Sequence, residues 1–381
     1  MSLRQTGFHD RAASAGARFD EYAGYELPYR FGDDVLPEYF ACRQRAAVID
    51  LSPLRKIEVA GSDAGKLLQS VVTRDIDRLA DGQIVYTALC DAEGNVLDDG
   101  TVFRFGPDRF RWVGYQDEDE SWFRSHADRL GLQVALENST RRLHNIAIQG
   151  PASRQIVTGL IEPAPGRSNP EDLPWFRFTE GSLGGRGGPD VLLSRTGYSG
   201  ELGYEIWCHP DDGSAVWDTV FDAGASLGVG PLGLDALDIL RVEAGLVFKG
   251  YEYDGTQSPA EAGIGFVVTP DKRDDFIGKA AIARRQLNPD HVFVGLLVDA
   301  DDPLAGGDTV LGPDDAIVGA VTSGVLSPIL ERNIAFARIH PSSAAPGTKL
   351  TAKRADGGEA RISVTAATIP FYDADKSRVR S

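Results

Sequence analysis

Three glycines, each three residues from the next, separate two strand-forming stretches in residues 191–207, and this spacing constrains the fold more than any other feature. Apolar residues 191–193 and 204–207 favour strands, and the glycines between them permit tight turns. The segment therefore predicts a strand, a glycine-rich turn and a second strand. Glu205 places a carboxylate in the second strand. It either faces solvent, as most charged side chains do, or holds a partner inside the protein.

A pair of aspartates, Asp98 and Asp99, lies within residues 96–105, which also favour a strand. Side chains alternate between the faces of a strand. Asp99 therefore shares a face with the more apolar set, Leu97, Thr101, Phe103 and Phe105. Burial there raises the pKa of a carboxylate and makes Asp99 a candidate functional group. The alternative is that both aspartates end a hairpin turn, where this residue type is common.

The composition predicts a globular protein of two or three domains, because 42% of the 381 residues are hydrophobic and 25% are charged. A net charge of −17 argues against nucleic acid or an anionic membrane as a partner. Cys42, Cys90 and Cys208 lie far apart without metal-ligand spacing, so we expect no metal site and small core residues in a reducing compartment. We find no signal peptide or membrane-length apolar run and expect a cytoplasmic protein.

The pattern of the chain changes near residues 286–291, where we place a boundary between a region of 1–286 and a domain of 287–381. The first region alternates strands and helices. Helices are predicted over 11–23, 34–48, 63–72, 118–132, 152–160, 216–225, 234–244 and 276–286, and strands over 57–59, 84–89, 96–105, 110–115 and 143–148. The second shows short strands broken by glycine and proline, which is typical of a small barrel or sandwich. These strands are predicted over 292–298, 316–322, 334–339, 349–352 and 362–365.

Residues 195–205 resemble a motif of the glycine cleavage T-protein (aminomethyltransferase) family of tetrahydrofolate-dependent one-carbon transferases. The family pattern is R-T-G-Y-T-G-E-x-G-[FY]-E, from which this chain differs only by Ser199. Other blocks similar to the family follow in the same order and span nearly the whole chain. They are residues 21–28, 149–151, 241–245, 250–254, 258–259, 276–279, 319–328 and 370–372.

The resemblance implies an α+β fold, in which two interlocked domains with ferredoxin-like sheets surround a central folate channel and a β-barrel follows. It implies that Glu205 anchors the pterin ring, because a carboxylate accepts two parallel hydrogen bonds from the ring N–H and the amino group. Tyr198 and Tyr86 are expected in the same pocket. Asp99 corresponds to the catalytic aspartate of the family, which lies close to the reactive folate nitrogens.

The end of the chain carries two further candidates. Arg378 and Arg380 follow residues 370–372, where the family has an arginine that binds the glutamate tail of folate. The alternative is an ordinary charged, frayed terminus.

Three departures from the family pattern bear on the donor of the one-carbon group. Leu237 replaces a folate-contacting arginine, Gly114 stands near the place of an asparagine, and residues 53–55 (PLR) replace an H-M-G triplet. These changes resemble the branch that includes demethylases of methylated compounds. We therefore expect methyl or aminomethyl transfer to tetrahydrofolate from a small methylated amine or sulfonium compound.

Two alternatives remain open at this stage. In the first, the partner is the lipoyl carrier protein of glycine cleavage. In the second, the protein is a non-enzymatic folate-binding factor of iron–sulfur assembly; residues 249–252 (KGYE) lack the cysteine of that group's motif, which disfavours it. The sequence does not indicate an oligomeric state.

Overall fold

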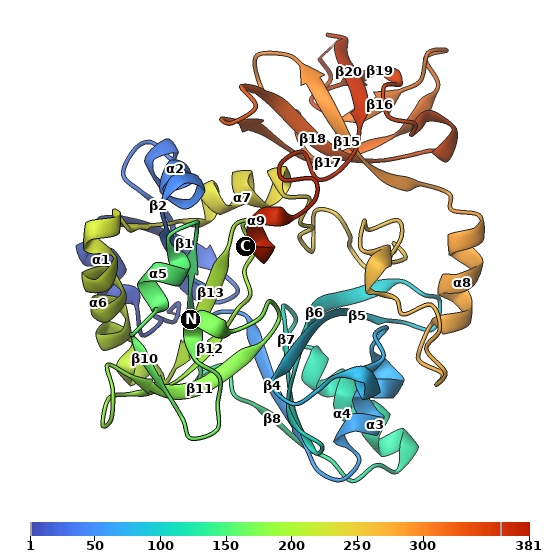
Figure 1. Cartoon of the computed structure of the whole chain (residues 1–381). Helices are drawn as coiled ribbons and strands as arrows, with labels where there is room; N and C mark the ends of the chain where they lie inside the picture. The colour runs from blue at the N-terminus through green and yellow to red at the C-terminus, as the bar shows by residue number, and fades with distance from the viewer. Residues whose placement is uncertain (1, 359) are drawn as a thin grey trace.

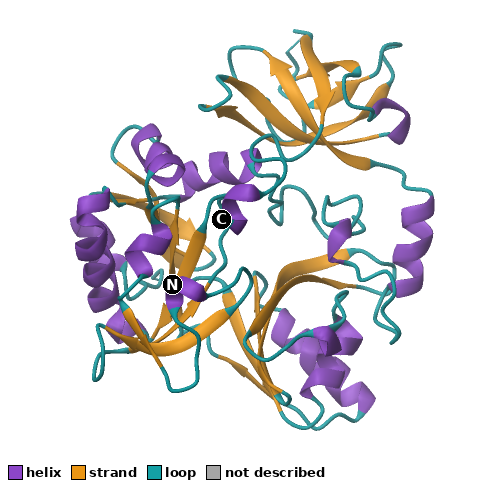
Figure 2. Cartoon of the chain, viewed as in Figure 1, coloured by secondary structure: helices purple, strands orange, loops and turns teal. Residues whose placement is uncertain are grey.

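The computed structural model describes residues 2–358 and 360–381 and contains two open sheets and one closed barrel besides an N-terminal hairpin (Figure 1). The two open sheets face one another, and the barrel lies beside them at the top of the view. Helices pack against the open sheets, whereas the barrel is built almost wholly of strands (Figure 2). The arrangement is the α+β architecture expected from the sequence.

The larger sheet has seven strands, covered by helices on both faces. In spatial order they are β10 (Ile161–Pro163), β11 (Phe178–Leu183), β12 (Asp190–Ser194), β13 (Gly203–Cys208), β9 (His144–Gln149), β3 (Ala47–Asp50) and β14 (Gly230–Pro231). On one face, apolar side chains pack against α1 (His9–Ser14), α5 (Ser153–Val157) and α6 (Gly213–Gly224). On the other face, α2 (Leu36–Gln44) and α7 (Leu234–Glu243) pack against Ala47, Ile49 and Ala147.

The smaller sheet has five strands with two helices on its outer face. The strands, in spatial order, are β5 (Gln83–Cys90), β6 (Val96–Gly106), β7 (Arg109–Gly114), β4 (Arg55–Ala60) and β8 (Ala135–Asn138). The helices α3 (Ala64–Val71) and α4 (Asp119–Leu130) bury Val102 and Trp112 from one side of this sheet. Phe103, on the opposite side, packs against Phe178 and Trp207 of the larger sheet. The two sheets therefore interlock through a shared apolar cluster.

The C-terminal barrel closes six strands around its own apolar core. The strands are β15 (Val292–Asp299), β18 (Arg332–Ile339), β17 (Ile317–Ser327), β16 (Thr309–Leu311), β19 (Lys349–Lys353) and β20 (Ile362–Ala367). Helix α8 (Lys279–Leu287) leads into β15, so the change of architecture falls where the sequence pattern changes. After the barrel, the chain returns to the two sheets and ends in α9 (Ser377–Arg380) (Figure 1).

The helices predicted over 152–160 and 276–286 are shorter than expected, and two others are wrong in larger part. The helix predicted over 11–23 ends at Ser14, and β1 (Ala17–Tyr22) then pairs with β2 (Tyr25–Phe31) in a hairpin. Gly16, with a φ of +88°, takes the left-handed conformation that ends a helix. The helix predicted over 34–48 ends at Gln44, because the next apolar residues form the buried strand β3. In the described part of the chain, no helix combines the length and apolar character needed to cross a bilayer.

Candidate functional site

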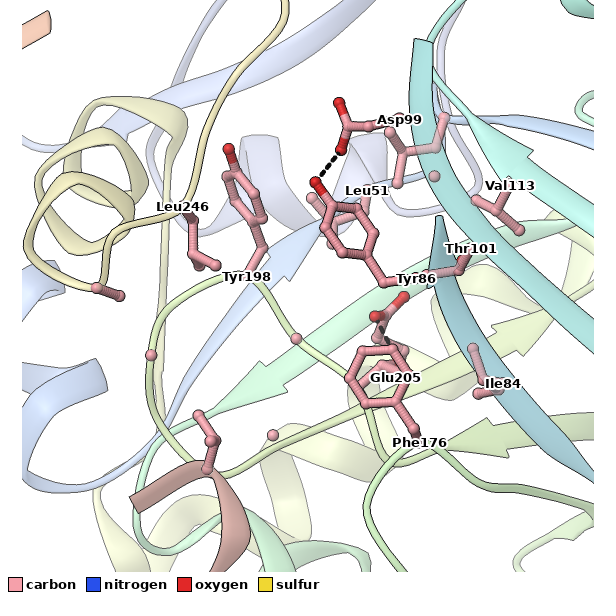
Figure 3. Close-up of a pocket in the computed structure, with 18 of the residues that line it drawn as sticks. Leu51, Ile84, Tyr86, Asp99, Thr101, Val113, Phe176, Tyr198, Glu205 and Leu246 are labelled. Atoms are coloured by element: carbon pink, nitrogen blue, oxygen red, sulfur yellow. Dashed lines mark hydrogen bonds between the residues drawn. The ribbon is translucent and has the colours of Figure 1, made fainter. Parts of the chain in front are cut away.

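A cavity of about 990 Å³ lies where the two sheets meet, and its lining includes every site residue predicted from the sequence except Arg378. Strands β5 and β6 supply one wall, and β13 with the turn before it supplies another. The segment after α7 and the C-terminal tail complete the lining. Figure 3 shows Asp99 and Glu205 on either side of the Tyr86 ring, with Tyr198 on the facing wall.

Glu205 is inside the protein, with 8% of its surface exposed, so the alternative of a solvent-facing carboxylate is wrong. Its strand neighbours Tyr204 and Ile206 pack against α1, α5 and α6 on one face of the sheet. Because side chains alternate along a strand, Glu205 points the other way, toward the cavity. Thr196 Oγ1 donates to Oε1 at 2.8 Å, and Asn145 Nδ2 donates to Oε2 at 2.9 Å. Burial raises the pKa of Glu205, while these two bonds oppose the rise.

Lys56 is a fully buried cation beyond Glu205 that the sequence analysis did not single out. Its Nζ donates to the Ser52 carbonyl at 2.8 Å and lies 5.5 Å from the centre of the Trp207 ring. Burial lowers the pKa of Lys56 to about 7, although the negative charges of Asp50 and Glu205 act to raise it. When protonated, Lys56 favours the ionised form of Glu205.

Asp99 borders the cavity from the middle of β6, as the alternation of the strand predicts. Tyr86 donates its hydroxyl to Oδ2 at 2.6 Å, and the Tyr253 hydroxyl donates to Oδ1. Burial, and next the charge of Asp98, raises the pKa of Asp99 to about 6. Both partners are neutral hydroxyls, and no ion pair in the described part of the chain includes Asp99.

Asp98 points to the opposite side of β6 and is fully buried, so neither aspartate ends a hairpin turn. It accepts hydrogen bonds from the backbone N–H groups of Tyr115 (2.7 Å) and Gln116 (3.1 Å). The carboxyl group of Asp119 lies beside it, and burial raises the pKa of both groups. The charge of Asp98 raises the pKa of Asp119 further, so the ionised forms disfavour one another.

The carboxyl groups of Asp98 and Asp119 explain why residue 114 is a glycine. A Cβ atom at this position would lie 2.7 Å from Asp98 Oδ2 and 2.8 Å from Asp119 Oδ2, closer than packed atoms allow. The side chain that stands near this place in the family pattern therefore has no room here. Strand β7 instead brings its backbone against the two carboxyl groups.

The two tyrosines predicted for the pocket both line it. Tyr86 holds Asp99, as described above, and its pKa is raised well above the ordinary value by burial. Tyr198 donates its hydroxyl to the Val247 carbonyl, which ties the glycine-rich turn to the segment after α7. Leu237, at the position of the family arginine, also borders the cavity and contributes an apolar surface.

The two C-terminal arginines have different positions. Arg380 lines the cavity, 5.1 Å above the ring of Trp175. Arg378 instead donates its Nε to Glu201 Oε2 at 2.7 Å, and Glu201 also pairs with the buried Arg43. Arg74 and Lys376 also line the cavity. Burial lowers the pKa of Arg74 and of Lys376.

Several groups that hold the predicted residues were not identified as such from the sequence. Thr196 and Tyr253 lie in blocks that resemble the family, and Asn145 lies in a predicted strand, but only the fold brings them to Glu205 and Asp99. Nothing in the sequence indicated that Lys56 is buried at the site, because a single lysine in a strand is ordinarily a surface residue.

Comparison with known proteins agrees with this geometry. The family model for the GCVT N-terminal domain matches residues 8–272, and the model for the glycine cleavage T-protein C-terminal barrel domain matches residues 292–373. A trimethylamine-oxide aldolase from Ruegeria pomeroyi is 45% identical over 99% of this chain, which spans 48% of the length of that enzyme. An aminomethyltransferase from Clostridium botulinum is 33% identical over 89% of this chain and 90% of its own.

A solved structure extends the agreement to three dimensions. The glycine cleavage system aminomethyltransferase T from Bartonella henselae superposes with a TM-score of 0.86 at 25% identity, over 98% of this chain and 99% of that one. Members of the matched family typically bind tetrahydrofolate. The family models and the relatives together show that this chain belongs to the glycine cleavage T-protein family of folate-dependent enzymes.

Proposed function

We propose that this protein transfers a one-carbon group to tetrahydrofolate from a small donor whose methyl group is bound to a positively charged nitrogen or sulfur. The observation that carries the proposal is that, among the acidic residues that line the cavity, Glu205 and Asp99 lie in different surroundings. Glu205 is held by neutral donors near the buried Lys56, whereas no ion pair among the described residues includes Asp99.

Glu205 fits a pterin ring. Each of its oxygens accepts one hydrogen bond from the protein, and an ionised carboxylate has about four acceptor positions. The remaining positions suit the parallel N–H groups of a pterin. A cavity of about 990 Å³ is at the upper end of the usual range for ligand sites, so a folate and a small donor can share it.

Asp99 fits the donor. Its buried negative charge attracts a cationic group, and the fixed Tyr86 and Tyr253 hydroxyls hold the carboxylate in place. In the transfer, a folate nitrogen gives its electron pair to the methyl carbon. The bond from that carbon to the donor nitrogen or sulfur breaks, and its electron pair stays with the departing neutral donor. The folate nitrogen then releases its proton, so the reaction needs no oxidant or reductant.

Two considerations favour a small donor over a carrier protein. The relative at 45% identity is named for trimethylamine oxide, whose methyl groups are bound to nitrogen, whereas the aminomethyltransferases among the relatives are 33–34% identical. Pro53 and Leu54, from the altered triplet, border the cavity and add apolar surface there. The alternative remains aminomethyl transfer from a lipoyl carrier protein.

Calorimetry and mass spectrometry test this proposal. We expect the protein to bind tetrahydrofolate and, with a panel of methylated ammonium and sulfonium compounds, to form 5-methyltetrahydrofolate. Failure to bind tetrahydrofolate would overturn the proposal. Turnover with the aminomethylated lipoyl carrier alone would overturn the donor class and identify an aminomethyltransferase.

A further inference from the structure

Three aromatic rings from distant parts of the chain meet at one side of the cavity. They belong to Tyr22 at the end of β1, Tyr115 after β7 and Phe248 after α7, and we call them the aromatic corner. The ring centres are 5.9 Å apart for Tyr22 and Tyr115, 6.0 Å for Tyr115 and Phe248, and 6.3 Å for Tyr22 and Phe248. The ring planes are inclined to one another by 50–67°, so the three do not stack.

Hydrogen bonds fix the aromatic corner beside Asp99. The backbone N–H of Tyr115 donates to Asp98 Oδ2 at 2.7 Å. Lys249, the residue after Phe248, donates its Nζ to the Leu97 carbonyl at 2.5 Å. Two of the three rings are therefore tied to the two residues that precede Asp99 on β6, and all three border the cavity that Asp99 borders.

No ion pair among the described residues includes Asp99. Lys249 is a cation on this side of the cavity, and Asp98, Asp119, Glu118 and Asp99 all favour its charged form, Asp98 the most. Lys249 lowers the pKa of Asp99 less than the Tyr253 and Tyr86 hydroxyls do. Arg55 is paired with Asp117. The charge of Asp99 therefore remains for a ligand.

We propose that the aromatic corner and Asp99 together form the donor subsite, and that this subsite takes the methylated head of an ammonium compound. The inference rests on the proposed function and names the substrate class and the residues that select it. Aromatic faces attract cations without needing N–H donors, and they are the usual surface for quaternary ammonium groups. A primary ammonium group has three N–H donors that ring faces leave without acceptors. The subsite therefore selects methylated over unmethylated amines.

Nuclear magnetic resonance with tetramethylammonium as the probe tests the subsite in the full chain. We expect saturable binding with upfield shifts of the methyl protons, because protons above a ring face are shielded. Phe248→Leu keeps apolar bulk but removes the ring, and should weaken binding about thirtyfold, whereas Phe248→Tyr should restore it. Tyr251→Leu is the matched control: this ring lies 5.7 Å from Phe248 but is 55% exposed and outside the cavity lining, so binding should not change.

A second comparison uses only the wild-type protein, so it does not depend on the folding of a variant. Choline should bind at least tenfold more tightly than its uncharged isostere 3,3-dimethyl-1-butanol. Equal affinity for the two compounds, or tetramethylammonium binding that Phe248→Leu and Asp99→Asn leave unchanged, would overturn the inference. Tetrahydrofolate affinity is measured in parallel. Loss of folate binding in the wild type overturns the proposed function, whereas intact folate binding without cation selectivity overturns the donor subsite alone.

Discussion

The Glu205 and Asp99 ends of the cavity present the same chemical group in different electrostatic surroundings. At both, burial raises the pKa of a carboxyl group held by two neutral side-chain donors. Beyond Glu205 lies the buried cation Lys56, which favours ionisation. Beside Asp99 lies the carboxyl group of Asp98, which disfavours it.

This difference assigns the two ends to different ligands. A buried carboxylate whose ionised form is favoured by a nearby protonated lysine suits neutral N–H donors. A carboxylate without a counter-ion is stabilised by a ligand that brings positive charge. Under the proposed function, the cavity orders its two substrates by charge: the neutral pterin at Glu205 and the cationic donor at Asp99. Each prediction below changes one end and leaves the other intact.

The largest effect is expected from Asp99→Asn. The amide keeps the size and the hydrogen-bonding shape but removes the charge, so transfer should fall about 10²- to 10³-fold while tetrahydrofolate affinity stays within about twofold. Product formation by mass spectrometry and folate binding by calorimetry measure the two quantities. Asp98→Asn is the matched control, because Asp98 faces the core and its loss should be far milder. Full activity of the Asp99→Asn protein would contradict the assigned role.

Glu205→Gln should have the opposite selectivity. One acceptor oxygen becomes a donor, so a pterin loses one matched hydrogen bond, at a cost of about 2 kcal/mol or about thirtyfold in tetrahydrofolate affinity. The new amide can donate to the Thr196 hydroxyl, so the fold should tolerate the change. Calorimetry measures folate affinity, and tetramethylammonium binding serves as the control for the Asp99 end. If Glu205→Gln weakens tetramethylammonium binding and leaves folate binding unchanged, the assignment of the two ends is reversed.

The pH dependence of donor binding should follow Asp99. A cation binds the ionised carboxylate, and the pKa of Asp99 is raised to about 6, so affinity should be full above pH ~7 and fall about tenfold per unit below pH ~6. Asp98→Asn removes a charge that raises this pKa and should shift the decline to lower pH. Titration with tetramethylammonium between pH ~5 and ~8 measures the profile. A profile that is the same in the Asp99→Asn protein would assign the titration to another group.

The sequence predicted the two carboxylates but not the surroundings that distinguish them. Local alternation placed Asp99 on the correct face of its strand, because that pattern depends only on neighbouring residues. Tyr253 could not be assigned in this way, because it is 154 residues from Asp99 in the sequence. Lys56 could not be assigned either, because nothing in the sequence of its strand sets it apart. The helix predicted over 11–23 included β1, whose pairing with β2 has a register shift between Arg18 and Phe19. What sequence patterns miss here is contact between distant segments.

The smallest effect is expected at the C-terminus, where two arginines near one another in sequence test whether the cavity extends to a folate tail. Arg380 borders the cavity above Trp175, so Arg380→Gln should weaken a polyglutamylated folate up to about fivefold and the monoglutamate hardly at all. Arg378 is paired with the buried Glu201, so Arg378→Gln should lower the melting temperature and affect both folates equally. Calorimetry with the two folates and thermal unfolding separate these outcomes. If Arg380→Gln changes the affinity for the two folates by the same factor, the glutamate tail does not bind at Arg380. A selective loss in Arg378→Gln would place the tail at the ion pair instead.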